Sequence, residues 1–334
     1  MSPVLGGVAF PHWHPHLDVW VLVASAALLY FGAVRRERAR RAPGAAGTGP
    51  VVTRGQVGSF AGALAVLLVA SDWPVHDLAE GYLYSVHMIQ HLLFTLGASV
   101  LLLLGTPAWM ARRLVGLGRP GAAPTRRLRV VRVLSRPLAG LAQFNLVLVL
   151  SHWPAVVEAT VRHHPLHFLA HAVLLSSAVL MWLPVASPLP EVPRATPPLQ
   201  MLYLFLQTVV PTVPASFLTF GAHPLYHVYE TFPRLWGISA LDDQQTAGLI
   251  MKLVGGLYLW TIIAVIFFRW YAREERVEER ARRAPPATAR PATAFGPHRP
   301  AAEPLPGPDD DVLLWEDVEQ ELRRLEGGSA DRPR

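Results

Sequence analysis

Two pairs of histidines lie inside long apolar stretches of the sequence, and the members of each pair are four residues apart: His87 with His91, and His167 with His171. On a helix, residues i and i+4 share one face about one turn apart, so each pair can direct two imidazole rings at one point. Ionisable side chains inside a membrane-spanning helix are costly and usually face an interior site. The pairs therefore predict a metal site if their helices face each other, although a histidine in a helix can also serve in packing alone.

The donor atoms narrow the choice of metal. Neither motif has a glutamate directly after its first histidine, so the zinc metalloprotease arrangement is excluded. The chain has no cysteine, which excludes disulfide bonds and thiolate metal sites. Imidazole donors suit copper or zinc, and histidines from two helices also suit haem iron. Copper fits best at a site on the oxidising side of a membrane, with zinc and haem as alternatives.

Four further side chains are candidates for the same site. His152 ends an apolar stretch and is either a fifth ligand or a histidine at the membrane interface. Asp243 opens the last apolar stretch, where it either stabilises the helix dipole or orients a histidine ligand. Met88 and Met251 are either thioether donors for Cu(I) or packing residues.

Other histidines gather in the connections. Three alternate near the amino terminus and either capture metal transiently or lie at the headgroups; they are His12, His14 and His16. His76 stands among acids that form either a solvated acidic loop, the more ordinary interpretation, or an electrostatic funnel for cations; they are Asp72, Asp77 and Glu80.

The elements that must position these residues are membrane-spanning helices. The composition is 51% hydrophobic and 16% charged, and a helix of about 20 apolar residues crosses the hydrocarbon core of a bilayer. The chain is predicted to be all-α, a polytopic membrane protein with a seven-transmembrane helix bundle. The predicted spans are 17–34, 57–73, 82–104, 137–153, 165–183, 199–220 and 247–270.

Arginines predict the orientation of the bundle, because basic connections stay on the cytoplasmic side. Alternate connections carry 21 arginines, within segments 35–56, 105–136, 184–198 and 269–283, whereas the opposite connections carry only Arg162 and Arg234. The amino terminus is therefore predicted outside and the carboxyl terminus in the cytoplasm. All 14 histidines except His298 then lie on the outer side. The basic charge is assigned to topology and to contact with anionic membrane lipid, not to nucleic acid.

The chain is predicted to have two parts. Residues 1–270 form the membrane domain. Residues 271–334 form a cytoplasmic segment: an Arg/Ala/Pro-rich flexible linker to residue 308, followed by a short amphipathic helix that begins after three aspartates at 309–311.

Several motifs, in order along residues 75–270, resemble the CtaG family of cytochrome c oxidase (haem–copper oxidase) assembly factors. They occupy residues 84–93 with 104–107, 151–154, 167–171 with 182–184, and 243–245 with 248–251. Lys252 departs from the family pattern, where an apolar or aromatic residue is expected. The amino-terminal histidines and the carboxyl-terminal segment have no counterpart in that pattern.

The resemblance implies a multi-pass protein of the bacterial plasma membrane that helps to mature haem–copper oxidases at the copper step, with oxidase subunits as partners. It implies metal ligation by His87, His91, His152, His167, His171 and Asp243.

The predicted function is that of a copper-binding metallochaperone. It binds copper at an outer-side histidine cluster and delivers it to the oxidase, or stabilises the oxidase, and is not an enzyme. The alternatives are a membrane haem-binding cytochrome and a copper transporter or docking scaffold. A transporter would need polar residues through the inner half of the bundle, where the spans offer little beyond Asn145 and Gln207. The sequence leaves the oligomeric state open.

Overall fold

The computed structural model describes residues 15–41, 49–117 and 123–283, and within them it contains helices and no strands. The predicted all-α class is confirmed. The chain divides into two compact units, residues 1–281 and 282–334, and the helical bundle lies in the first. The elements, in chain order, are α1 (Leu17–Arg40), α2 (Arg54–Ser71), α3 (Val75–Gly81), α4 (Tyr84–Leu92), the π-helical η1 (Leu93–Ala98), α5 (Ser99–Gly105), α6 (Ala108–Leu114), α7 (Arg126–Leu134), α8 (Pro137–Ser151), α9 (Pro154–Arg162), α10 (His164–Ala186), α11 (Pro197–Phe220), α12 (His227–Glu230), the 3₁₀-helical η2 (Leu235–Gly237) and α13 (Ala240–Arg283).

Six helical segments are long and apolar enough to cross a membrane; they are formed by α1, α2 with α3, α4 through α5, α10, α11 and α13. The predicted fourth span differs. Its helix α8 has 15 residues, which is about 22 Å at 1.5 Å per residue and shorter than a typical hydrocarbon core. It qualifies only together with α7, and the two are bent by 83° at the break between them. The described part of the chain therefore has six such helices, or seven if the bent pair counts as one span.

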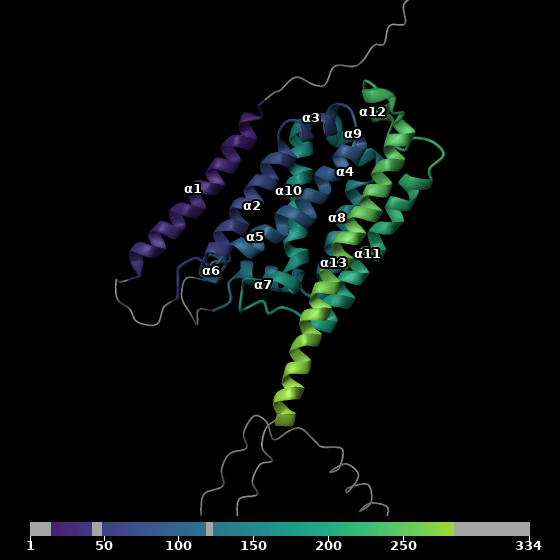
Figure 1. Ribbon diagram of the computed structural model, residues 1–334. Coiled ribbons are helices and arrows are strands. Elements are labelled where there is room, and N and C mark those ends of the chain that lie inside the picture. Colours follow the sequence, from purple (N-terminus) through teal and green to yellow (C-terminus); the bar gives the residue numbers. More distant parts are fainter. Residues whose placement is uncertain (1–14, 42–48, 118–122, 284–334) are drawn as a thin grey trace, which may run out of the picture. The chain divides into compact units, whose positions relative to one another are not determined.

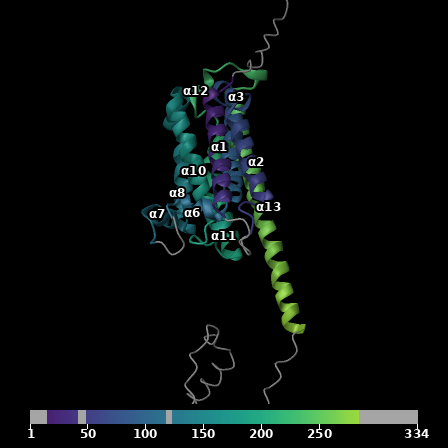
Figure 2. The same cartoon turned by 90° about the vertical axis from the view of Figure 1, so that its left-hand side faces the viewer.

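Short connecting helices lie at the two ends of the bundle. Figure 1 shows α3, α9 and α12 at one end, and α6 and α7 toward the other; the second view agrees for α3, α12, α6 and α7 (Figure 2). The first group belongs to the connections rich in histidine, and the second to connections rich in arginine. The structure thus separates the two residue types as the sequence analysis requires, and the side that faces the cytoplasm stays a prediction.

The last helix is longer than predicted. Residues 271–283 were predicted to begin a flexible linker, but they continue α13 to Arg283. The predicted start of the linker at residue 271 is therefore wrong. The remaining linker, the predicted amphipathic helix, His12, His14 and His298 lie outside the described residues.

A polar network joins three helices inside the apolar core. Asn145 of α8 donates to the side-chain oxygen of Gln207 on α11 at 2.8 Å, and Gln207 donates to the Tyr203 hydroxyl at 3.0 Å. That hydroxyl donates to the Met181 carbonyl of α10 at 2.7 Å. Hydrogen bonds between helices fix their relative position in a membrane, where apolar contacts alone discriminate poorly against lipid.

Gly248 lets α13 approach α11 closely. A Cβ atom at this position would overlap the Thr219 side chain and the Ala215 carbonyl. The close approach fixes the amino-terminal part of α13, which carries Asp243, against the rest of the bundle.

Candidate metal centre

The two histidine pairs face each other. Ring centroids are 4.3 Å apart within the α4 pair, His87 and His91, and 4.2 Å apart within the α10 pair, His167 and His171. Across the helices the separations are 5.3 Å for His87 with His167, 5.6 Å for His87 with His171, and 5.2 Å for His91 with His171. We name these four residues the buried centre.

Their nitrogen atoms lie close to one another, and Nε2 of His167 is 3.0 Å from Nε2 of His171, so that one of these two atoms donates to the other. One ring nitrogen from each of His87, His167 and His171 lies within 4.8 Å of the others, and a small contraction would bring them to the roughly 2.0 Å bonds that imidazole makes to a metal ion. The Nδ1 atoms of His87 and His91 are buried without a hydrogen-bond partner. An unpaired buried polar atom carries a desolvation penalty, which coordination of an ion can offset.

Glu80 joins this group from α3. Its Oε1 lies 2.9 Å from Nδ1 of His167. The angles at this contact do not suit a hydrogen bond, and both atoms lack a hydrogen-bond partner, so we treat the pair as an electrostatic contact. A carboxylate against one ring nitrogen orients a histidine so that the other nitrogen can bind metal. The solvated-loop interpretation of this region was wrong: it is helical, and the Glu80 side chain is 19% exposed. The four-residue spacing of His76 and Glu80 was the available signal.

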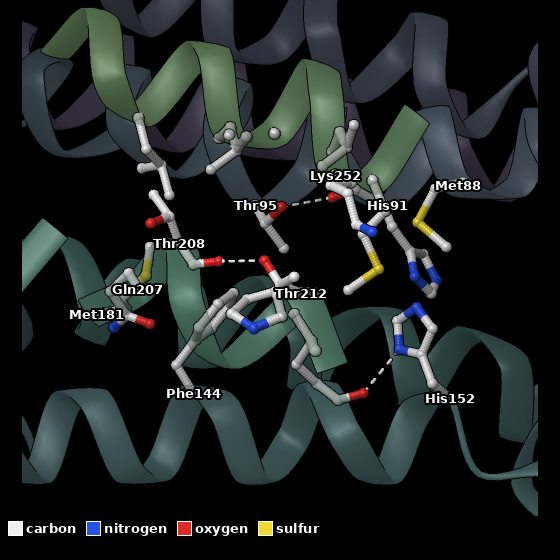
Figure 3. A pocket seen from close by; sticks show the side chains of 18 of the residues that line it. Met88, His91, Thr95, Phe144, His152, Met181, Gln207, Thr208, Thr212 and Lys252 are labelled. Carbon is white, nitrogen blue, oxygen red and sulfur yellow. Dashed lines mark hydrogen bonds between the residues drawn. The ribbon is translucent and has the colours of Figure 1, made fainter. Parts of the chain in front are cut away.

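His152 lies beside the buried centre at the end of α8, with its ring centroid 6.0 Å from that of His91. Its Nδ1 donates to the Leu148 carbonyl at 2.7 Å, which leaves the lone pair of Nε2 available, and Nε2 is buried without a partner. The Tyr226 hydroxyl donates to the His152 carbonyl at 2.9 Å; burial raises the pKa of Tyr226 to about 12, so the hydroxyl keeps its proton. In Figure 3 the rings of His91 and His152 point toward each other.

A small cavity of about 60 Å³ adjoins these two rings. Its wall includes Met251 and also His91, His152, Met88 and Lys252, which are labelled in Figure 3. The amine of Lys252 donates to a serine hydroxyl of α11 at 3.2 Å. The cavity therefore combines soft donors at one end with a positive charge on its wall.

Asp243, which the family pattern suggests as a metal ligand, lies at the amino-terminal end of α4. Its carboxylate oxygens accept the backbone N–H groups of Tyr84 at 2.6 Å and Ser85 at 3.0 Å, and the residue is 2% exposed. These amides open α4, whose own N-cap, Leu83, cannot accept a hydrogen bond through its side chain. Asp243 thus caps, from α13, the helix that carries His87, and the structure does not bring it into the histidine cluster.

A π-helical segment, η1, follows His91 directly. Such segments widen a helix and free backbone carbonyls, and here side chains satisfy them: Thr95 donates to the His91 carbonyl at 2.7 Å and Trp182 to the Thr95 carbonyl at 2.9 Å. Tyr258 donates to the Leu96 carbonyl at 2.9 Å. These bonds tie α10 and α13 to the segment, and so hold the α10 histidines against those of α4.

Comparisons with known proteins place this chain in a family. Two curated relatives, "Uncharacterized protein Mb0105" of Mycobacterium bovis and "Uncharacterized protein MT0111" of Mycobacterium tuberculosis, are each 25% identical to this chain over 218 residues. The similarity covers 59% of this chain and 31% of each relative, so the chain spans about a third of their length. No solved structure matches. The family described as cytochrome c oxidase caa3 assembly factor (Caa3_CtaG) matches residues 28–273, and the chain therefore belongs to that family.

Proposed function

We propose that this assembly factor binds copper, as Cu(I), at the buried centre and passes the ion to a haem–copper oxidase. The supporting observation is a cluster of imidazoles from two helices in which the Nδ1 atoms of His87 and His91 are buried without a hydrogen-bond partner. Imidazole is a good ligand for copper, and the family's role in oxidase assembly gives the bound ion a destination.

The proposed transfer is ligand exchange. His152 adds a fifth imidazole, whose ring centroid is 6.0 Å from that of His91. Because more imidazoles are present than the ion needs, one protein ligand can leave the ion while a histidine of the client replaces it. No covalent bond of a substrate is made or broken in this process, and the protein acts as a metallochaperone without catalysing a reaction. The Glu80 carboxylate beside His167 partly neutralises the charge of the ion.

The proposed location is the outer side of the bacterial plasma membrane. The end of the bundle formed by α3, α9 and α12 (Figure 1) carries His76 in α3, His163 directly after α9, and His227 in α12. The opposite end holds the arginine-rich helices α6 and α7, which favour the cytoplasmic side. A client whose copper site is open to that outer side could receive the ion there.

The geometry favours this function over the alternatives. A haem needs a slot for its macrocycle between two axial histidines, whereas ring centroids of the buried centre on opposite helices are only 5.2–5.6 Å apart. A copper transporter needs a path onward with polar groups, whereas the small cavity beside His91 is lined mainly by apolar side chains, such as Leu96, Phe144 and Leu259. Zinc shares the ligand preferences of the site, and metal analysis separates it from copper.

The test is copper binding by the purified full-length protein in lipid nanodiscs, measured by competition with a chromophoric Cu(I) chelator. We expect bound copper in the wild type, and its loss together with a fall in cellular oxidase activity when His87 and His167 are replaced by alanine. His227→Ala is the matched control, because this exposed histidine contacts Glu230 at 2.8 Å, away from the centre. A wild-type protein that retains no copper, with a double variant that supports the oxidase fully, would overturn the proposal; an intense Soret band would favour haem.

A further inference from the structure

A second group of ligand atoms lies next to the buried centre. His76 and Glu80 on α3, and His164 at the start of α10, offer three ligand atoms within 4.8 Å of one another. Oε1 of Glu80 is 3.4 Å from Nε2 of His76, and Oε2 is 3.6 Å from Nε2 of His164. The two histidines thus contact opposite oxygens of one carboxylate.

The exposure of these side chains falls stepwise toward the interior. The side chain of His164 is 77% exposed, those of His76 and Glu80 are 14% and 19% exposed, and that of His167 is 3% exposed. His164, His167 and His171 are spaced i, i+3 and i+7 on α10, a pattern that places them along one helical face. Of these side chains, that of His164 is therefore the most open to solvent and that of His167 the most enclosed.

Glu80 belongs to both groups. Its Oε1 is 3.4 Å from His76 and 2.9 Å from Nδ1 of His167, and the ring centroids of His76 and His167 are 6.1 Å apart. An ion can therefore exchange ligands one at a time between the groups without crossing an apolar gap. His16, one of the amino-terminal histidines, packs edge-on against His76 with centroids 4.5 Å apart.

We propose that His76, Glu80 and His164 form a loading site, which takes up the same ion as the buried centre from solution and passes it inward past Glu80. The inward transfer rests on the proposed function, whereas binding at the loading site does not. The donor chemistry sets the direction: a mixed set with a carboxylate is less suited to a soft ion than imidazoles alone, so Cu(I) is held more weakly at the loading site than at the buried centre. The negative carboxylate in a partly open position attracts the arriving cation.

The experiment uses the full-length protein in nanodiscs, with Cu(I) supplied from a chelator whose absorbance reports both the amount bound and the rate of uptake. The test variants are His164→Ala, whose exposed side chain is not needed for folding, and the double variant His76→Ala with His164→Ala. His227→Ala is the control for removal of an exposed histidine that contacts a glutamate. We expect the double variant to lose the weaker copper equivalent and to load the tighter one about tenfold more slowly, with the affinity of the tighter one unchanged. We expect His164→Ala to slow loading in the same direction.

The outcomes separate this proposal from the proposed function. Unchanged stoichiometry and unchanged uptake in the double variant would overturn the loading site. The proposal would also be overturned if the His76→Ala, His164→Ala protein lost as much affinity for the tighter copper equivalent as the His87→Ala, His171→Ala protein does. The two groups of residues would then form one site. Suppose instead that the His87→Ala, His171→Ala protein binds copper like the wild type, while the His76→Ala, His164→Ala protein loses it. The proposed function then fails, and the loading site stands as a binding site.

Discussion

Replacing Asp243 with asparagine should loosen the helix that carries His87 and His91 without removing any imidazole of the buried centre. The carboxylate of Asp243 accepts two backbone N–H groups, from Tyr84 and Ser85, at 2.6 and 3.0 Å. An asparagine of the same shape has one side-chain oxygen, and its NH₂ group would face the second N–H without accepting from it. One of the two bonds is therefore lost.

The magnitude follows from the strength of such bonds. A hydrogen bond to a charged group contributes about 1.5–3 kcal/mol, so the free energy of unfolding should fall by about that amount. The affinity for copper should fall by less than about tenfold, the lower end of what residues that orient ligands contribute. The change acts only through the position of α4, whereas His87→Ala removes a donor atom and should cost far more affinity.

The assay is unfolding of the detergent-solubilised protein in an SDS titration, paired with the Cu(I) chelator competition. Asp242→Asn is the matched control, because Asp242 is the exposed neighbour whose carboxylate accepts from the Ser239 hydroxyl within the same helix terminus, at 2.6 Å. Suppose that Asp243→Asn loses copper as completely as His87→Ala while its unfolding free energy stays at the wild-type value. Asp243 would then be a ligand, and the reasoning from its two backbone bonds would be refuted.

Three further predictions concern the rest of the site. Glu80→Gln should weaken copper binding by about 10–100-fold, because a carboxylate that orients a ligand histidine is lost; unchanged affinity in the chelator assay would contradict that role. Trp182→Phe should lower the free energy of unfolding by about 0.5–1.5 kcal/mol, since it removes the hydrogen bond from the indole N–H to the Thr95 carbonyl, which keeps only the Ser99 hydroxyl as a side-chain donor; an SDS titration that coincides with wild type would count against it. The chain has no cysteine, so single-cysteine variants give clean labelling by a membrane-impermeant maleimide. Ala222→Cys should react in intact cells and Ala123→Cys only after permeabilisation, and the reverse pattern would invert the proposed orientation.

Local patterns of the sequence account for much of the structure. Runs of apolar residues predicted the positions of most of the long helices, because a helix that crosses a membrane needs little more than sufficient length and hydropathy. The spacing of His87 with His91, and of His167 with His171, placed each pair on one face of its helix. That inference needs only 3.6 residues per turn and no knowledge of neighbours. The bend between α7 and α8 was not predicted, because the hydropathy of a stretch does not record where its axis turns.

The amino-acid sequence by itself determined that the chain is helical, that it lacks thiol ligands, and that two helices carry paired imidazoles at suitable spacing. Only the tertiary structure decided what surrounds those rings. Asp243 reaches α4 across 159 residues of sequence, and Glu80 reaches His167 from a separate helix. The physical reason is that periodicity fixes which face of one helix a residue occupies, whereas a contact between helices depends on their mutual rotation and depth, which packing of the whole bundle sets.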